Sequence, residues 1–568
     1  MNLLSDLRYA VRLLLKAPGF TVVAIVTLAL AIGVNVAIFS VVSGFLIRPL
    51  PFPEPDRLMQ AMRSFPEGHA PSVSLPRFVN WRDHNQVFTH MAAYDTLGAG
   101  FNLSGDGPPE RLVGSRVTRD FFTVFGIAPE IGRDFLPEED RPGARKVAIL
   151  SHDLWQRRFG ADRGLVGKQL VMNGESYTVV GIMPVGFRFP ARCELWTPVG
   201  LDPTTTEKAN YLEIAGRLKP GATREQAEAA LTLLTKRMAA EHPDMMAPNE
   251  TAMVVPVQER LYGRLRPALL VLLGAVAFVL LIACVNVANL QLARAAARQR
   301  EMAIRTVLGA SSSRIVRQLL VESLVLALLG GAVGLGLAYL GVPALLALSP
   351  IPLERMAPIV IDFRVLLYTL VLSLGAGVLF GLVPATGAAR ASLAEPLKEG
   401  TNRSTGGTKG ARTRRILVVS EVALALVLIT GAALLVKSFL GIVRTDPGFA
   451  PDHVLTVKLS LPEGKYGRGE ALEALTRQIV ERVSGLPGVQ SAAAASTLPL
   501  EDGPDLPFAI EGRYNGGKGL DAVGVGEAQY RALTPDLLKT LKIPLVAGRG
   551  IEDGDRAGAA PIVLVNEA

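Results

Sequence analysis

Residues 267–293 read PALLVLLGAVAFVLLIACVNVANLQLA, a stretch without a single charged side chain. A helix needs about 20 apolar residues to cross the hydrocarbon core of a bilayer, so this stretch is long enough to span one. Four further apolar runs are of comparable length: 20–47, 323–353, 365–389 and 416–436. Only the last is interrupted by a charge, at Glu421. The sequence therefore predicts an α-helical integral membrane protein with five spans.

The composition of the whole chain agrees with this prediction. Of its 568 residues, 49% are hydrophobic and 19% are charged, and the mean hydropathy is +0.33. These values exclude a disordered tail, a collagen-like fibre and an ordinary water-soluble enzyme. The two cysteines, Cys193 and Cys284, are too few for a disulfide scaffold or a CxxC metal or redox site. The net charge of +8 does not predict nucleic-acid binding, because the basic residues cluster at the ends of apolar runs.

These basic clusters also predict the topology, because Lys and Arg are enriched on the cytoplasmic side of membrane proteins. They lie before the first run, between the second and third, and between the fourth and fifth. A cytoplasmic N-terminus places all three on one side and leaves the two long intervening segments extracytoplasmic. The expected order is an amphipathic cytoplasmic segment, a span, an outer domain, three spans, a cytoplasmic linker, a fifth span and a second outer domain: 1–19, 20–47, 48–266, 267–389, 390–415, 416–441 and 442–568.

The two outer segments contain related sequences. VTRDFFTVFGIAPEIGRDF (117–135) is matched by LTPDLLKTLKIPLVAGRGI (533–551), and their identical residues are all 416 positions apart. After a one-residue deletion, DRPGARKVAILS (140–151) is matched by DRAGAAPIVLVN (555–566). The order and spacing predict a tandem duplication that includes the preceding span. The second copy stops at the equivalent of Asp153, so we expect the sequence to be C-terminally incomplete.

The outer segments mix strand and helix patterns, which predicts an α+β domain. GKQLVMNGESYTVVGIMP (167–184) reads as a hairpin around Asn173-Gly174, a pair that favours a type I′ turn. Residues 210–221 read as a strand ending in a turn, and Thr223 with Gln226 forms a capping box for the helix that follows. In the second copy we expect strands at 454–461 and 489–497 and a helix at 470–486.

Neither an ATPase motif nor a catalytic constellation is found in the sequence. GxxxxGK[ST] is absent, so the chain has no P-loop of its own. His84 and His90 lack the spacing of metal ligands, and the acidic run 138–140 reads as a solvated loop. We therefore predict no catalytic residue, no cofactor and no metal.

Several residues within the apolar runs are candidates for helix packing. Asn286 and Asn289 lie three residues apart on one face of the second run, and Asn35 lies within the first. Interhelical hydrogen bonding is the simplest role of all three. Glu322 and Glu421 lie just inside cytoplasmic ends, where an interfacial ion pair with Arg317 or Arg415 is favoured over a proton relay. Two pairs of glycines four residues apart permit close helix contact: Gly330 with Gly334, and Gly377 with Gly381.

The connection ARAAARQREMAIRTVLGASSSRIVRQLLVES (293–323) joins the second and third runs on the predicted cytoplasmic side. Its central part has helical spacing of apolar residues, and Gly309 ends that pattern. Such a short amphipathic helix is either an interfacial anchor or a docking surface for a cytoplasmic partner.

RQREMAIRTVLGAS (298–311) after NVANLQLARA, together with GKQLVMNGESYTVVGIMP, resembles the FtsX-like permeases. Within these, the chain resembles the MacB-type proteins that carry a periplasmic core domain. The duplication and the opening LLSDLRYAVRLLLKAPGFT, with RPLPFPEPDRL after the first run, resemble the acidobacterial duplicated orphan permeases.

This resemblance implies a permease of the ABC type in the bacterial inner membrane, in which two permease halves pair. In MacB-like relatives, cytoplasmic ATPase subunits drive motion of the outer domains through the helices, which is called mechanotransmission. The relatives' coupling segment maps to 294–313, and its candidate residues here are Glu301, Ala303, Arg305, Leu308 and Gly309. Segment 1–19 is too short to be an ATPase, so the resemblance implies an ATPase supplied in trans.

Two other functions stay open at this point. The first is an ATP-independent envelope scaffold or receptor that binds a protein, peptide or lipid through its outer domains. The second is an extracytoplasmic enzyme, which the missing catalytic constellation disfavours.

Overall fold

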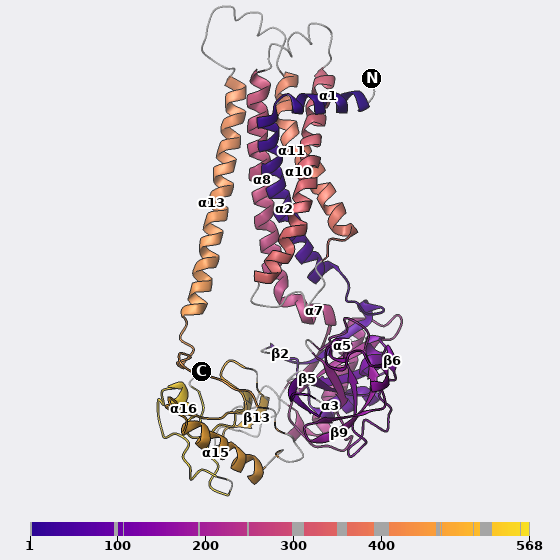
Figure 1. Ribbon diagram of the computed structural model, residues 1–568, viewed down its shortest axis with the longest axis vertical. Helices are drawn as coiled ribbons and strands as arrows, with labels where there is room; N and C mark the ends of the chain where they lie inside the picture. Colours follow the sequence, from indigo (N-terminus) through magenta and orange to yellow (C-terminus); the bar gives the residue numbers. More distant parts are fainter. Residues whose placement is uncertain are drawn as a thin grey trace, which may run out of the picture. The chain divides into compact units, whose positions relative to one another are not determined.

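The computed structural model describes residues 3–566 except for these positions: 67, 96–99, 106, 191–192, 247–248, 298–311, 349–359, 391–407, 460, 462–465, 467–468, 502, 504, 512–524 and 557. The chain forms two compact units (Figure 1). The helical unit comprises Met1–Arg48 and Tyr262–Thr445, and the sheet unit comprises Pro49–Leu261 and Asp446–Ala568.

In its described residues, the helical unit is built from one short helix and five long ones. Its elements are α1 Leu3–Leu15, α2 Pro18–Val42, α8 Arg266–Ala297, α10 Ser312–Leu348, α11 Phe363–Arg390 and α13 Thr408–Arg444. A π-helical turn, Ser43–Ile47, extends α2, and a 3-10 turn, Gly263–Leu265, precedes α8. Among the described residues, five helices are long and apolar enough to cross a membrane, one at each predicted run: Pro18–Ile47, Val257–Ala295, Val316–Ala344, Phe363–Leu382 and Arg414–Arg444.

The third apolar run contains a proline, Pro343, and α10 continues through it to Leu348. Proline removes one backbone hydrogen bond of a helix, and membrane helices tolerate it because neighbouring groups and local adjustment satisfy the freed carbonyl.

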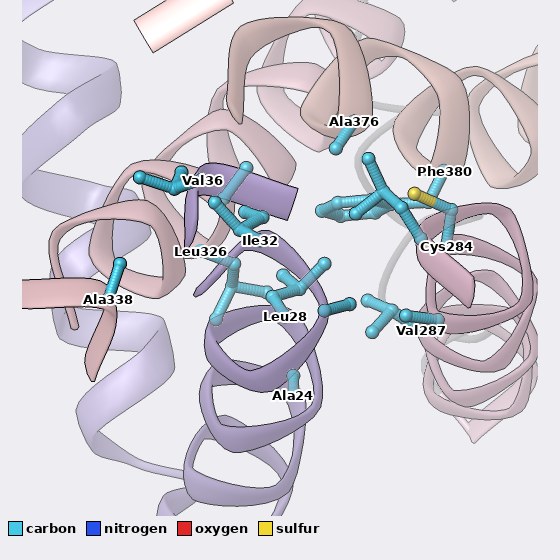
Figure 2. Close-up of a cluster of buried hydrophobic side chains, with 14 of the residues drawn as sticks. Ala24, Leu28, Ile32, Val36, Cys284, Val287, Leu326, Ala338, Ala376 and Phe380 are labelled. Atoms are coloured by element: carbon cyan, nitrogen blue, oxygen red, sulfur yellow. The ribbon is translucent and has the colours of Figure 1, made fainter. Parts of the chain in front are cut away.

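Helices α2, α8, α10 and α11 lie side by side in Figure 1, and α1 lies across one end of this bundle. Apolar residues of these helices, among them Leu28, Val287, Leu326 and Phe380, form one buried cluster (Figure 2). Helix α13 is exposed along most of its length, as expected of apolar side chains that face lipid.

The larger part of the sheet unit, residues 49–261, is called the core domain here. Its sheet has the order β10-β7-β9-β8-β4-β5-β3-β11-β1-β12, with β2 beside β1 and β6 beside β9. Its strands are β1 Leu58–Phe65, β2 Gly68–Ala70, β3 Phe88–Asp95, β4 Gly100–Ser104, β5 Glu110–Val117, β6 Ile131–Gly132, β7 Val147–Leu150, β8 Gln169–Met172, β9 Glu175–Ile182, β10 Leu195–Pro198, β11 Leu212–Leu218 and β12 Thr251–Pro256. Because β10 also pairs with β5, the strands from β10 to β5 close into a ring.

Two hydrophobic clusters of the core domain correspond to these two parts of the sheet. One fills the ring and includes Phe101, Leu112 and Leu195. The other lies between the open strands β3, β11, β1 and β12 and two helices, α3 Leu75–His84 and α6 Arg224–Glu241. Shorter elements complete the domain: α4 Phe121–Phe125, α5 His152–Phe159, α7 Val257–Tyr262 and 3-10 turns at Pro55–Arg57, Arg163–Leu165 and Pro243–Met245.

Two local predictions in the core domain are confirmed. β8 and β9 form the predicted hairpin, and Asn173 and Gly174 both have positive φ, at 55° and 78°, as a type I′ turn requires. Thr223 caps α6: its hydroxyl accepts from the backbone N–H of Gln226 at 3.3 Å, and the Gln226 side chain accepts from the backbone N–H of Thr223 at 3.0 Å.

The second part of the sheet unit holds α15 Glu470–Ser484, the paired strands β13 Asp505–Ala509 and β14 Val525–Gln529, and α16 Leu537–Leu541. The predicted helix at 470–486 is α15. The predicted strand at 454–461 is wrong for its described residues, and 489–497 forms only a bridge from Ala495 to Leu533. In the core domain the corresponding strand β1 lies between β11 and β12, and the described residues of 446–566 contain no equivalent of either partner.

Candidate functional site

Helices α2 and α10 approach each other closely because glycines face each other. A methyl group on Gly33 of α2 would lie 2.9 Å from the carbonyl oxygen of Gly334 on α10, and one on Gly330 would lie 2.7 Å from Cβ of Leu28. Real Cβ atoms do not occupy such positions without movement of a neighbour. This contact therefore depends on the absence of side chains at both helices.

Gly377 and Gly381 of α11 face α10 in the same way. A methyl group on Gly377 would lie 3.1 Å from Cβ of Ala327, and one on Gly381 would lie 2.8 Å from Cβ of Ser323. Ser323 is fully buried and exchanges hydrogen bonds of 3.1 Å with Gln291 of α8. The three helices α8, α10 and α11 thus meet around Ser323.

The asparagines of the bundle differ in their contacts. Nδ2 of Asn35, on α2, donates to the carbonyl oxygen of Val276 on α8 at 2.8 Å, which is an interhelical hydrogen bond. Asn286 and Asn289 lie on α8 and are partly buried, and Oδ1 of Asn289 is buried without a hydrogen-bond partner among the described residues. Of the three asparagines for which the sequence favours interhelical hydrogen bonding, Asn35 is the one that is seen to join two helices.

The helix ends beside segment 298–311 are both attached to α1. Nη2 of Arg294, in the last turn of α8, donates to the carbonyl oxygen of Leu13 at 2.9 Å. Nη2 of Arg317, near the start of α10, forms an ion pair of 2.7 Å with Oδ2 of Asp6. Helix α1 therefore braces both flanks of the predicted coupling segment.

The candidate coupling residues themselves lie outside the described residues: Glu301, Ala303, Arg305, Leu308 and Gly309. The structure gives no account of their positions.

The predicted pairing of Arg317 with Glu322 is wrong. Arg317 pairs with Asp6, and the buried Glu322 accepts instead from Nε2 of Gln318 at 3.2 Å. Asp6 is far from Arg317 in sequence and reaches it only because α1 packs against α10. Local sequence spacing contains no signal for such a contact.

Strand β11 of the core domain holds the connection that follows α2. Nη1 of Arg217 donates to the carbonyl oxygen of Pro53 at 2.9 Å, and its Nε donates to that of Val124 at 2.9 Å. Phe52 inserts beside these bonds, with its ring centroid 5.0 Å from that of Phe125. Residues 49–54 are thereby fixed to the sheet.

The same strand also holds α7, which leads into α8. Nη2 of Arg260, on α7, forms an ion pair of 3.0 Å with Oε1 of Glu213. The other carboxylate oxygen of Glu213 accepts from the hydroxyl of Tyr94 at 3.0 Å and from Nε2 of Gln60 at 3.1 Å. Burial, and next the negative charge of Glu213, raise the pKa of Tyr94 well above its ordinary value, so the phenol stays protonated and donates.

Glu213 and Arg217 lie on one face of β11, because side chains of a strand alternate and these two are four residues apart. The opposite face carries Leu212, Ile214 and Leu218, which belong to a hydrophobic core. Sequence reasoning identified the strand but missed these two residues. The signal was available: two opposite charges at even spacing in an otherwise apolar strand.

The acidic run 138–140 is not the solvated loop that the sequence predicts. Glu139 and Asp140 are both buried. Glu139 forms a two-pronged ion pair with Arg133, and Oδ1 of Asp140 accepts from the backbone N–H of Gly200 at 3.0 Å. Among the described residues, no group of three or more His, Cys, Asp or Glu side chains is arranged to hold a metal ion.

Residues 21–234 match the family model described as MacB-like periplasmic core domain, and residues 273–393 match the one described as FtsX-like permease C-terminal. The chain carries the two domains of a MacB/FtsX-like permease. The region that matches the periplasmic core domain precedes the region that matches the permease domain.

Curated relatives include proteins that are named as parts of ABC transporters. The pyoverdine export ATP-binding/permease protein PvdT of Pseudomonas syringae pv. syringae is 28% identical over 46% of this chain and 39% of its own length. The macrolide export ATP-binding/permease protein MacB of Hahella chejuensis is 28% identical over 50% of this chain and 42% of its own. The uncharacterized ABC transporter permease YknZ of Bacillus subtilis is 25% identical over 49% of this chain and 68% of its own. The chain thus matches about two fifths of the length of the first two.

Proposed function

We propose that the chain is the permease subunit of an ABC-type efflux or mechanotransmission complex in the bacterial inner membrane. The observation that carries this proposal is the attachment of both membrane connections to β11, through Arg217 on one side and Glu213 on the other. Movement of α2 or α8 along its axis would pull on this strand rather than on a loose linker. The MacB-like and FtsX-like domain matches support the same function.

Energy would come from a separate cytoplasmic ATPase that docks on segment 294–313. The relatives PvdT and MacB are named as combined ATP-binding/permease proteins, whereas the matched domains here are permease domains. The bracing of Arg294 and Arg317 by α1 supports this role, because a force-transmitting segment needs fixed ends. We assign Glu301, Ala303, Arg305, Leu308 and Gly309 to the docking surface.

Photo-crosslinking from position 305 in native membranes tests this assignment. We expect an ATPase subunit in the adduct, identified by mass spectrometry, and its loss on replacing Gly309 with a bulky residue. A probe at the exposed Thr206 of the core domain is the matched control and should not capture the ATPase. An adduct with lipid alone, from a probe shown to react, would reject ATPase docking and favour the scaffold or receptor function.

We further propose an N-terminus in the cytoplasm, with 48–266 and 442–568 outside it, and a tandem duplication in which the two permease halves pair. The contacts around two positions support the duplication. Arg133 binds both carboxylate oxygens of Glu139 at 2.8 and 2.6 Å, and Arg549 binds both of Asp555 at 2.7 and 2.8 Å. Each member of the second pair lies 416 positions after its counterpart.

A second repeated contact involves a threonine before a short helix. Thr118 exchanges hydrogen bonds of 2.9 and 3.0 Å with the backbone of Ala93, and Thr534 exchanges bonds of 2.9 Å each with that of Ala494. The helices α4 and α16 follow at the same offset. These contacts align Asp555 with Glu139 rather than with Asp140, so the one-residue deletion falls after this ion pair. Because these contacts are repeated, we propose that the chain is a duplicated permease like the duplicated orphan permeases that its sequence resembles.

A further inference from the structure

Helix α1 has three distinct faces. Asp6, Ala10 and Leu14 are buried against the helical unit. The next face carries an apolar stripe at spacing four whose side chains are exposed by 44%, 41% and 74%: Leu7, Val11 and Leu15. Beyond it lies a basic stripe at the same spacing, also exposed: Arg8, Arg12 and Lys16. With about 100° per residue, the three stripes follow one another around the helix.

The positive charge of the basic stripe is not neutralised within the described part of the chain. Asp6 is the acidic residue of α1, and it faces the bundle, where it pairs with Arg317 at 2.7 Å. No ion pair to Arg8, Arg12 or Lys16 is found among the described residues. The outward side of α1 therefore presents three cations beside an apolar stripe.

The helix is held in this orientation. The bond from Arg294 to the carbonyl oxygen of Leu13 fixes its second half, and the guanidinium of Arg294 lies 4.7 Å from the ring centroid of Phe20 in α2. The ion pair at Asp6 fixes its first half. Rotation that would bury Leu7, Val11 and Leu15 against the bundle would break these contacts.

The position of α1 places these stripes at a membrane surface. It lies across the end of the bundle (Figure 1), and the span-forming helix α2 begins at Pro18, directly after Lys16 and Ala17. A helix that lies in the interface buries its apolar stripe at the acyl boundary and keeps its cations at headgroup level. Negatively charged headgroups attract such cations electrostatically.

We propose that α1 is a docking surface for anionic phospholipid headgroups, which bind Arg8, Arg12 and Lys16 while Leu7, Val11 and Leu15 enter the acyl region. Lipid charge would then act on the helix that braces Arg294 and Arg317. This binding does not depend on an ATPase, so it can hold or fail independently of the proposed function.

The full chain, reconstituted into vesicles, tests the proposal. Val11→Cys carries a bimane label on the apolar stripe, and Cys193 and Cys284 are buried, which keeps background labelling low. Vesicles contain phosphatidylcholine and phosphatidylglycerol in equal amounts, with brominated acyl chains on one or the other. We expect brominated phosphatidylglycerol to quench the label about twofold more than brominated phosphatidylcholine.

The triple variant Arg8→Gln/Arg12→Gln/Lys16→Gln should lose this preference, and 0.5 M NaCl should weaken it, since salt screens exposed charges. A matched control removes three exposed cations from α13 instead, by Arg412→Gln/Arg414→Gln/Arg415→Gln, and should keep the preference. Equal quenching by both lipids would overturn the proposal by showing an anchor without charge selection. Absence of quenching by either lipid would overturn it too and would point to a protein partner on this face.

Discussion

At the scale of single residues, Asp134 of the core domain makes stability depend on pH. Its carboxyl is partly buried, and burial is the main cause that raises its pKa to about 6, against the lowering effect of the Phe135 backbone N–H. Between about pH 4 and 6 the folded protein keeps a proton that the unfolded chain releases, so stability falls as pH rises through this window. Above this pH window, the ionised carboxylate lowers the stability of the folded protein by an amount that no longer changes with pH.

We expect Asp134→Asn to stabilise the core domain by about 2 kcal/mol at pH 7.5 and by almost nothing at pH 4. The three tryptophans, Trp81, Trp155 and Trp196, all lie in this domain, so tryptophan fluorescence during thermal unfolding of the full chain follows it selectively. Asp202, whose pKa is lowered by the hydrogen bonds that it accepts from Thr204, is the control position, and Asp202→Asn should bring no such gain. An equal effect of Asp134→Asn at both pH values would show that its ionisation is not the cause.

A second prediction at this scale concerns the contact of α11 with α10. Gly377→Leu would force Leu324 and Ala327 of α10 aside, because even a methyl group there lies about 3 Å from them. We expect a loss of about 1–3 kcal/mol, the usual cost of overpacking. Gly375→Leu is the matched control, since nothing lies within 4 Å of a Cβ at Gly375. Thermal stability in detergent, measured by size-exclusion chromatography after heating, should fall for position 377 only.

The residues that sequence alone could predict are those whose partners are close in the chain. Asn173-Gly174 forms its turn and Thr223 forms its capping box because each needs only its immediate neighbours. The sequence favours Glu322, five residues away, as the partner of Arg317, but the actual partner is Asp6, which lies near the start of the chain. A contact of that kind is set by helix packing, which local spacing does not encode.

At the scale of elements, β11 is the strand on which both membrane connections depend. Arg217→Met removes the side-chain N–H groups that donate to the carbonyl oxygens of Pro53 and Val124. Hydrogen bonds from charged groups contribute about 1.5–3 kcal/mol, so amide exchange in residues 50–58 and 121–127 should accelerate about tenfold or more. Hydrogen exchange with mass spectrometry on the full chain measures this directly.

Glu213→Gln should loosen a different region, residues 257–262, because it weakens the ion pair with Arg260. Arg237→Met on α6 is the control for both variants, since Arg237 is exposed and, within the described part of the chain, pairs only with Glu241 of its own helix. Exchange that rises evenly across the domain would mean general destabilisation and would contradict the assignment of separate attachments. Unchanged exchange in both regions would contradict attachment altogether.

Strands are predictable from pattern only where their pairing partners exist. Residues 212–218 became β11 because β1 and β3 lie on either side. Residues 454–459 have an equally strong strand pattern but no neighbouring strand among the described residues, and Leu455 and Val457 are 90% and 73% exposed. Backbone pairing, which the pattern cannot supply, decides between the two outcomes.

At the scale of the whole molecule, hydropathy predicted the five apolar helices, and mixed strand and helix patterns predicted an α+β domain after the first. The closure of β10 onto β5 was not predictable, because these strands are about 80 residues apart and nothing local specifies their parallel pairing. The bracing of α8 and α10 by α1 escaped prediction for the same reason. Long-range geometry of this kind arises only when the complete unit packs.

The proposed topology gives the last prediction, which single cysteines and a membrane-impermeant maleimide can test. In this proposal, α1 and residues 390–415 lie in the cytoplasm and both sheet-containing parts lie outside it, because positive charge is concentrated at three helix ends. We therefore expect Thr206→Cys and Ser484→Cys, both at exposed positions, to react in intact spheroplasts. Arg412→Cys should react only after permeabilisation. Because Cys193 and Cys284 are buried, wild-type labelling provides the baseline. Labelling of position 412 before permeabilisation would show that the proposed topology is inverted and would exclude a cytoplasmic docking site for an ATPase. Labelling of position 206 without position 484 would contradict the proposed pairing of two duplicated halves.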